Sequence, residues 1–317
     1  MQIRLTATMA ALAWSSIAAA APAPQLMQPV DKWQLDFGDT QCTAARSFGD
    51  AGAPVVLGIV PTLNGAYYKM MVSVPRAGPP YAKEAKGTVD FGRGPIASEL
   101  LYFGKSGVKQ SVYQIVLSAA QMAQAEGATG MTVSADRASY GFALADMGSL
   151  LAGLRECNAD LNKYWNMGQA PAVTAGEPLG DIRSVLTARD YPTEAQWVKP
   201  SRTVQYQLLI DEKGAVARCD VLSPSGAQVV DSTGCQVIAG RTKFRPAKDA
   251  AGKPVRSAWT TPPLVWTPTT QSALDSGCAK VSSDGGTLVD QCGQPATSQM
   301  RIEQPVAMPP PPPPSSH

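Results

Sequence analysis

Alternating apolar and polar positions indicate a strand-rich first half of the chain. Five runs have the alternation or the β-branched composition of strands, at 54–60, 66–74, 110–117, 130–134 and 140–145. Over 145–165 the period lengthens to that of a helix, and one apolar stripe is formed by Leu150, Leu154, Cys157, Leu161 and Tyr164. The pattern therefore predicts a β-rich α+β domain over 31–165 that ends with an amphipathic helix.

A second periodic region covers 179–266, after a linker at 166–178 that is rich in Pro, Gly and small residues. One of its strands is marked by alternating apolar residues at Val204, Tyr206, Leu208 and Ile210. Beyond it, 267–294 reads as a hairpin, and 295–317 is a Pro-rich tail that cannot form a packed core. The whole chain is thus predicted to be α+β.

The first 20 residues have the pattern of a secretory signal peptide. Arg4 precedes an apolar run that ends in Ala18, Ala19 and Ala20, and the run is short for a membrane span. We expect a mature protein that begins near Ala21, lies in the periplasm and keeps no stable membrane span. An uncleaved N-terminal anchor is the alternative.

The chain has six cysteines, and an even number in a protein that we expect to be exported predicts disulfide bonds. Cys157 lies on the apolar helix stripe, and Cys42 is its predicted partner. Cys219 shares a strand face with Ala217 and Val221. Cys235 lies on the short helix that follows, so we expect it to bond to Cys219.

The last two cysteines flank a predicted three-residue loop at 284–286. A hairpin around that loop sets Cys278 opposite Cys292, at a cross-strand separation that suits a disulfide. The sequence therefore predicts a hairpin that is held together by its own bridge.

Several features of 190–266 resemble the C-terminal domain of the TonB family of envelope energy transducers. Tyr191-Pro192 is similar to the family's entry to a first short helix, and Ser223-Pro224-Ser225-Gly226 to its bend into the main helix. Phe244-Arg245-Pro246-Ala247 and Gly252-Lys253-Pro254-Val255 are similar to the exit from that helix and the start of the last strand.

The resemblance implies a small antiparallel sheet that carries two helices, with an edge that pairs with an extended peptide from an envelope partner. The last strand, over 255–266, would supply this edge, through Val255, Ser257, Trp259 and Thr261. Pro262 and Pro263 are compatible with an edge strand, and the alternative is that they only protect that edge from aggregation. In the family's energy transducers an uncleaved anchor and a long Pro-rich spacer precede this domain, whereas here we expect a signal peptide and a folded domain at those positions.

Composition argues against most catalytic and metal chemistry. The single histidine is His317, so the sequence offers neither a Ser-His-Asp triad nor a histidine zinc site, and bridged cysteines supply no thiolate. We expect no metal and no cofactor. A formal net charge of +2 gives no basic face for nucleic acid. Acid–base catalysis by a pair of carboxylates remains an alternative, and Asp36 and Asp39, on either side of Gly38, are weak candidates for it.

These observations favour a non-enzymatic periplasmic protein or peptide interaction module of the Gram-negative cell envelope. One alternative is a TonB-type energy transducer that retains residues 1–20 as an anchor. Another is a carboxylate-dependent hydrolase in the first domain. The sequence leaves the partner, the oligomeric state and the role of the first domain open.

Overall fold

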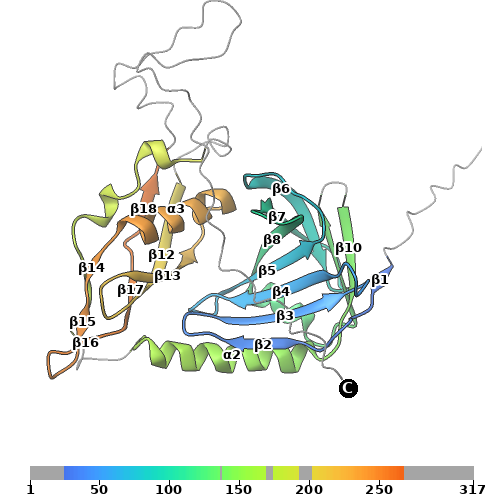
Figure 1. Ribbon diagram of the computed structural model, residues 1–317, viewed down its shortest axis with the longest axis horizontal. Coiled ribbons are helices and arrows are strands. Elements are labelled where there is room, and N and C mark those ends of the chain that lie inside the picture. The colour runs from blue at the N-terminus through green and yellow to red at the C-terminus, as the bar shows by residue number, and fades with distance from the viewer. Residues whose placement is uncertain (1–24, 136–137, 169–173, 193–201, 268–317) are drawn as a thin grey trace, which may run out of the picture.

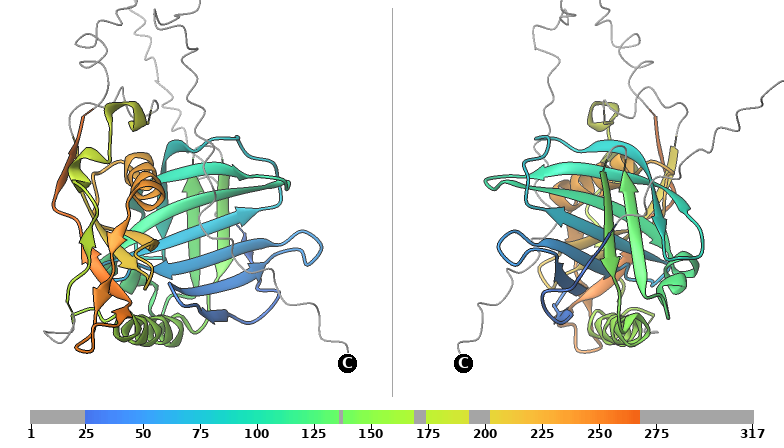
Figure 2. Two further views of the ribbon diagram at one scale, coloured as in Figure 1. Left: turned by 60° about the vertical axis from the view of Figure 1, so that its left-hand side comes forward. Right: turned by 90° about the vertical axis from the view of Figure 1, so that its right-hand side faces the viewer.

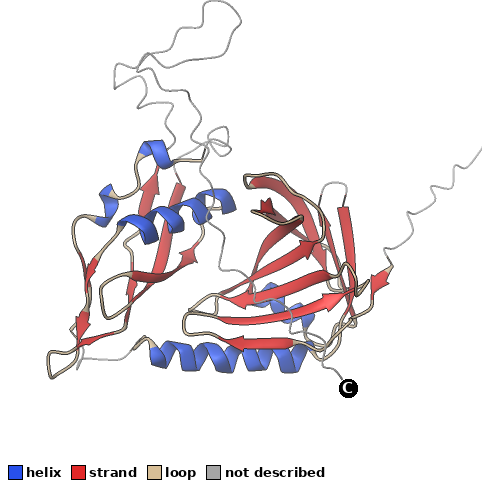
Figure 3. Cartoon of the chain, in the orientation of Figure 1, coloured by secondary structure: helices blue, strands red, loops and turns tan. Residues whose placement is uncertain are grey.

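The computed structural model describes residues 25–135, 138–168, 174–192 and 202–267. The first half forms one large curled sheet with a long helix beneath it, and the second half forms a smaller sheet beside it (Figures 1 and 3). The chain is therefore α+β and rich in strands, as the alternation predicts. The predicted hairpin with Cys278 and Cys292, and the Pro-rich tail, lie outside the described residues.

The curled sheet has ten strands in the order β1-β10-β9-β6-β7-β8-β5-β4-β3-β2. Every neighbouring pair is antiparallel except β1 and β10. The bounds are β1 Leu26–Met27, β2 Gln34–Phe37, β3 Cys42–Phe48, β4 Val55–Pro61, β5 Tyr67–Val74, β6 Lys83–Asp90, β7 Ile96–Lys105, β8 Gln110–Ser118, β9 Gly130–Ala135 and β10 Ala138–Ala143.

The segment that leads from β1 to β2 joins the two ends of this sheet. β1 pairs with β10 at one end, and two residues later Pro29 bridges to Phe48 of β3 near the other end. The Val30 N–H donates to the Ser47 carbonyl at 2.9 Å, and the Gly49 N–H donates to the Gln28 carbonyl at 2.9 Å. The sheet therefore wraps round on itself, as Figure 2 shows.

Apolar residues fill the inside of the curl. Phe48 and Phe142 meet edge to face at 5.1 Å and are fully buried, with Leu57, Met70 and Ile115 in the same cluster. Burial of this apolar surface supplies the main driving force for the curl.

The helix α2 (Met147–Tyr164) covers one side of the core. Leu150, Leu154, Cys157 and Leu161 are buried as the stripe predicts, and Cys157 is bonded to Cys42 of β3. The prediction that Tyr164 belongs to the buried stripe is wrong, because its side chain is 43% exposed and stacks against Arg256, which lies between β16 and β17. The stripe therefore ends one turn before the helix does.

β12 (Arg202–Ile210) is the central strand of the smaller sheet. It pairs on one side with β13 (Val216–Ser223) and on the other with β17 (Ser257–Thr260) and β18 (Leu264–Trp266). The four residues whose alternation predicts β12 are all fully buried, in a cluster with Ile238 of the helix α3 (Gln228–Arg241). Gly234 lets α3 approach closely, because a Cβ there would come within 2.0 Å of the Tyr206 hydroxyl oxygen.

Short elements complete the described chain. β11 (Glu177–Pro178) pairs with β14 (Phe244–Arg245), and β15 (Ala247–Lys248) pairs with β16 (Pro254–Val255). The helix α1 (Ala119–Met122) is capped by Ser118 and Gln121. None of the helices in the described part of the chain has the length and apolarity needed to cross a bilayer.

Candidate peptide-binding edge

The last strand predicted from the sequence, over 255–266, is divided into three parts. Val255 belongs to β16 and faces Ala247 across a two-stranded hairpin. β17 and β18 then pair in turn with β12, and Thr261, Pro262 and Pro263 lie between them. Val255 is therefore not on the strand that pairs with β12, which is a correction to the continuous edge that we expected.

β17 has one side paired and one side unpaired within the described residues. Leu208 faces Trp259, and Gln207 faces Thr260, across the β12–β17 ladder. The Thr261 N–H donates to the Tyr206 carbonyl at 2.9 Å, so it points toward β12. Because successive N–H groups of a strand point in opposite directions, the Thr260 N–H points away from β12. Backbone groups of Ala258 and Thr260 thus form the outward edge.

Side-chain hydrogen bonds fix the end of this edge. The buried Thr261 hydroxyl accepts from the Tyr206 N–H at 3.0 Å, and Gln205 donates to the Thr261 carbonyl at 2.8 Å. The next two residues are prolines, which have no N–H to donate to a ladder. Main-chain pairing with a partner is therefore confined to β17 itself.

The side chains of β17 divide between its two faces. Trp259 packs edge to face with Phe244 at 5.3 Å, and Ser257 is buried near Gly176. On the opposite face, Ala258 packs against the core of the curled sheet, while Thr260 is exposed. Thr260 is thus the residue of β17 that is most open to solvent.

Comparison with known proteins finds a family match, and it lies in this part of the chain. Residues 187–267 match the family model of the Gram-negative bacterial TonB protein C-terminal domain. The match confirms the resemblance drawn from 190–266. No curated protein and no solved structure matches the chain.

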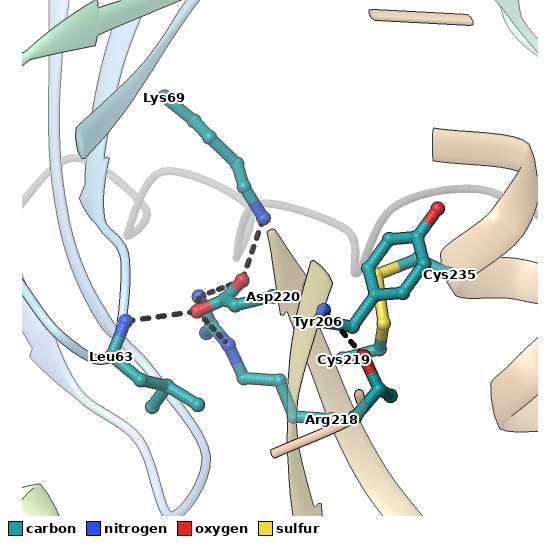
Figure 4. The surroundings of a disulfide bond; sticks show 8 residues. Leu63, Lys69, Tyr206, Arg218, Cys219, Asp220 and Cys235 are labelled. Atoms are coloured by element: carbon teal, nitrogen blue, oxygen red, sulfur yellow. Dashed lines mark hydrogen bonds and ion pairs between the residues drawn. A yellow bond between two sulfur atoms is a disulfide. The ribbon is translucent and has the colours of Figure 1, made fainter. Parts of the chain in front are cut away.

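Residues 187–267, called here the TonB C-terminal segment after the family match, contain the second predicted disulfide. Cys219 of β13 is bonded to Cys235 of α3, and both pack among the apolar residues between sheet and helix (Figure 4). The prediction that Ala217 shares a strand face with Cys219 is wrong, because Ala217 is exposed. An irregularity in the ladder places Val216, rather than Ala217, opposite Ile210 and in the core. Alternation alone could not have located this irregularity.

A buried carboxylate joins the TonB C-terminal segment to the curled sheet. Asp220 of β13 is 1% exposed and accepts from the Leu63 N–H at 3.0 Å and from Lys69 Nζ at 2.8 Å (Figure 4). Arg218 donates to the same carboxylate through two nitrogens at 3.0 Å, and also to the Thr40 carbonyl at 3.1 Å. The sequence does not reveal this cluster, because Leu63 and Lys69 lie about 150 residues before Asp220 in the chain.

The charged groups around Asp220 favour its ionised form. Burial by itself would raise the pKa of the carboxyl group, but Arg218 and Lys69 outweigh it and hold the pKa below its usual range. The carboxylate can accept all these hydrogen bonds only when it is ionised. The joint is therefore a satisfied charge network rather than a reactive acid.

A second contact involves the N-terminus of α3, where the N-cap residue Ala227 supplies no side-chain cap. Glu84 of β6 provides the missing acceptor, since its carboxylate receives the Val229 N–H at 2.9 Å. Val229 and Val230 pack there against Leu101 and Phe103 of β7. The curled sheet thus caps a helix of the TonB C-terminal segment.

The third contact is at the C-terminal end of α2. Asn166 donates to the Arg256 carbonyl at 2.8 Å, and the Arg256 guanidinium lies over the rings of Tyr164 and Trp165 at 4.2 and 5.6 Å. Arg256 also pairs with Glu212 at 3.0 Å. Three separate contacts therefore hold the segment against the curled sheet and leave the outward side of β17 unpaired within the described residues.

The two candidate carboxylates of the first domain lie on β2 and just after its end. Asp36 is exposed on β2, and Asp39 contributes its carbonyl oxygen as the acceptor for the Trp165 indole N–H at 2.6 Å. No group of three or more His, Cys, Asp or Glu side chains that could hold a metal ion occurs among the residues with described positions.

Proposed function

We propose that this chain is a non-enzymatic periplasmic interaction protein of the Gram-negative cell envelope. Its TonB C-terminal segment would bind an envelope protein through an extended peptide that adds a strand to β17. The proposal rests on one observation, the unpaired outward side of β17 in a segment that matches the TonB C-terminal family. Strand addition uses main-chain hydrogen bonds for affinity and side-chain contacts for selectivity.

The surroundings of β17 support this proposal. The strand is short and is followed by two prolines, so it offers an edge that a peptide can join while long edge-to-edge association is limited. The Cys219–Cys235 disulfide and the contacts of Asp220 and Arg256 hold the other parts of the segment in place. A preorganised edge loses little conformational entropy when it binds a peptide.

Thr260 gives the proposal a sharp test. Thr260→Pro removes the outward N–H and leaves the Thr261 bond to β12 intact, while Thr260→Ala keeps the N–H and serves as the matched control. Synthetic peptides from envelope proteins would be titrated against the mature protein, and backbone amide shifts followed by NMR. We expect shifts centred on β17, and affinity at least about fivefold weaker in Thr260→Pro, as the loss of a main-chain hydrogen bond implies.

The control variant should bind like the natural protein. If no peptide produces shifts at β17, or if both variants bind alike, the edge is structural and the proposal fails. N-terminal sequencing of the protein from fractionated cells provides a separate check. A chain that keeps Met1 and resides in the inner membrane would instead support an energy transducer.

A further inference from the structure

Three tyrosines and two cations lie on the inner face of the curled sheet. Tyr102 of β7 and Tyr113 of β8 are cross-strand partners, and their rings stack at 4.6 Å. Tyr140 of β10 comes from several strands away in the sheet and meets the Tyr113 ring at 5.6 Å. The curl of the sheet is what brings β8 and β10 together here.

Arg76 reaches this cluster from the connection between β5 and β6. Its Nη2 donates to the Tyr113 hydroxyl at 2.5 Å. The connection is held down by a close glycine contact, since Gly104 donates its N–H to the Pro79 carbonyl at 2.6 Å. A Cβ on Gly78 would come within 2.8 Å of the Gly104 backbone. These contacts hold the connection against β7, and the bond to Tyr113 positions the guanidinium although Arg76 is exposed.

Lys83 adds a second positive charge to the same face. It is the cross-strand partner of Tyr102 in the β6–β7 ladder, and directly opposed residues of a ladder share a face. Its Nζ lies 5.2 Å from the centre of the Tyr81 ring. Lys83, Tyr102 and Tyr113 therefore form one row across three strands.

The cluster is rich in donors and has no acidic partner in the described ranges. None of the ion pairs there includes Arg76 or Lys83. Glu84 and Glu99, the carboxylates of the adjoining strands, lie on the opposite face, because their neighbours in sequence, Lys83, Ala85 and Leu100, face inward. Burial is the main reason why the pKa of Tyr113 is raised, and a side-chain hydrogen bond with Tyr140 raises it further, which ties these two hydroxyl groups together.

We propose that Arg76, Lys83, Tyr102 and Tyr140 form a binding site for a small oxyanion, a carboxylate or phosphate group. The guanidinium presents several N–H donors in a planar fork that matches such a group. One of these donors holds Tyr113, and the others remain for a ligand. Tyr102 and Tyr140 contribute hydroxyl donors, and the stacked rings supply a rigid wall beside them.

The experiment titrates the mature protein with inorganic phosphate and, separately, with acetate, at an ionic strength held constant with sodium chloride. Amide shifts of β7, β8 and β10 are followed by NMR. We expect saturable shifts confined to this cluster, and the anion that binds more tightly identifies the preferred group. Arg76→Gln should weaken binding about tenfold, as the loss of a charged hydrogen bond implies.

Arg93→Gln is the matched control. Arg93 is an exposed arginine in the turn at the far end of the β6–β7 hairpin, so its loss should leave anion binding unchanged. Tyr102→Phe and Tyr140→Phe keep the rings and remove only the hydroxyl groups, and each should weaken binding severalfold. The proposal fails if neither anion produces saturable shifts, or if Arg76→Gln and Arg93→Gln bind alike.

Discussion

At the scale of single residues, Asp231 shows how burial changes the charge of a side chain. It lies in the first turn of α3 and accepts the Ser225 N–H at 2.9 Å. Burial is the main reason why its pKa rises from 3.8 to about 6, although the hydrogen bonds from Ser225 and the charge of Arg202 oppose it. Asp231 also lies near the buried Tyr206 hydroxyl, which has no hydrogen-bond partner among the described residues.

A carboxyl group whose pKa is raised by folding lowers the stability of the folded protein at neutral pH, where the group must ionise. The unfolded chain releases this proton near pH 4 and the folded chain near pH 6, so stability falls as the pH rises between these values. We therefore expect Asp231→Asn to increase the free energy of unfolding at pH 7 by about 1 to 3 kcal/mol. The gain should disappear below about pH 4, where both states are protonated.

Urea unfolding from pH 3.5 to 7.5 measures this dependence. The exposed Asp160 is the control, since replacing it with Asn removes only a surface ion pair with Lys163 and should change stability by less than about 1 kcal/mol. A gain in Asp231→Asn that does not vary with pH would show that ionisation is not its cause.

At the scale of elements, the two disulfides fix helices to sheets in two different ways. Cys42–Cys157 joins α2 to β3 across 115 residues of sequence, and Cys219–Cys235 joins α3 to β13 across 16. In the chain-entropy model, a bridge that closes the longer loop restricts the unfolded chain more. The two bridges should therefore differ in their contribution to stability.

Paired Cys→Ser variants test this difference. Replacing Cys42 and Cys157 should lower the free energy of unfolding by about 4 to 5 kcal/mol, and replacing Cys219 and Cys235 by about 3 kcal/mol. Denaturant titration under non-reducing conditions provides the measurement. An equal or larger loss from the short-loop pair would contradict the entropic explanation and indicate that packing between α3 and β13 dominates.

The strands that the sequence predicts are those with the clearest apolar runs. The five strands with apolar runs, β4, β5, β8, β9 and β10, are found within one or two residues of their predicted bounds. β2 is exposed at all four positions, and β6 consists largely of charged or small residues, so neither carries an apolar pattern. Their positions depend on partners in the sheet.

The candidate peptide-binding edge could likewise be predicted only in part from the sequence. Its two prolines are visible in the sequence and mark where pairing stops. The pairing of Val255 with Ala247 is not visible, because it depends on the hairpin formed by β15 and β16. The Asp220 and Arg76 clusters were missed for a related reason, since both bring together residues from separate strands and loops.

At the scale of the whole molecule, Asp220 links the two sheets. It receives hydrogen bonds from the curled sheet through Leu63 and Lys69, and from its own strand through Arg218. Removing one member of a buried charge network leaves the others without compensation, which costs more than the network contributes as a whole.

We therefore expect Asp220→Asn to lower the free energy of unfolding by about 3 kcal/mol at pH 7. Since the folded pKa of Asp220 is below its ordinary value, its contribution is present above about pH 4 and is lost as the pH falls further. Amide exchange of Leu63 should accelerate in the variant, because that N–H loses its charged acceptor.

Glu126→Gln provides the control for Asp220. It removes a surface ion pair with Arg155 and should cost less than about 1 kcal/mol, with Leu63 exchange unchanged. If Asp220→Asn leaves Leu63 exchange and stability as they are, the carboxylate does not join the sheets.

The way in which the segment from β1 to β2 closes the curled sheet constrains biogenesis. Leu26 and Met27 are synthesised more than 100 residues before their strand partners Gly141 and Phe142. The sheet therefore cannot be completed until β10 has been synthesised, because β10 is the strand with which β1 pairs along its length. Such a dependence on distant pairing slows folding and keeps strand edges open in the meantime. During that interval the unpaired edges of the incomplete sheet are exposed to association with other chains.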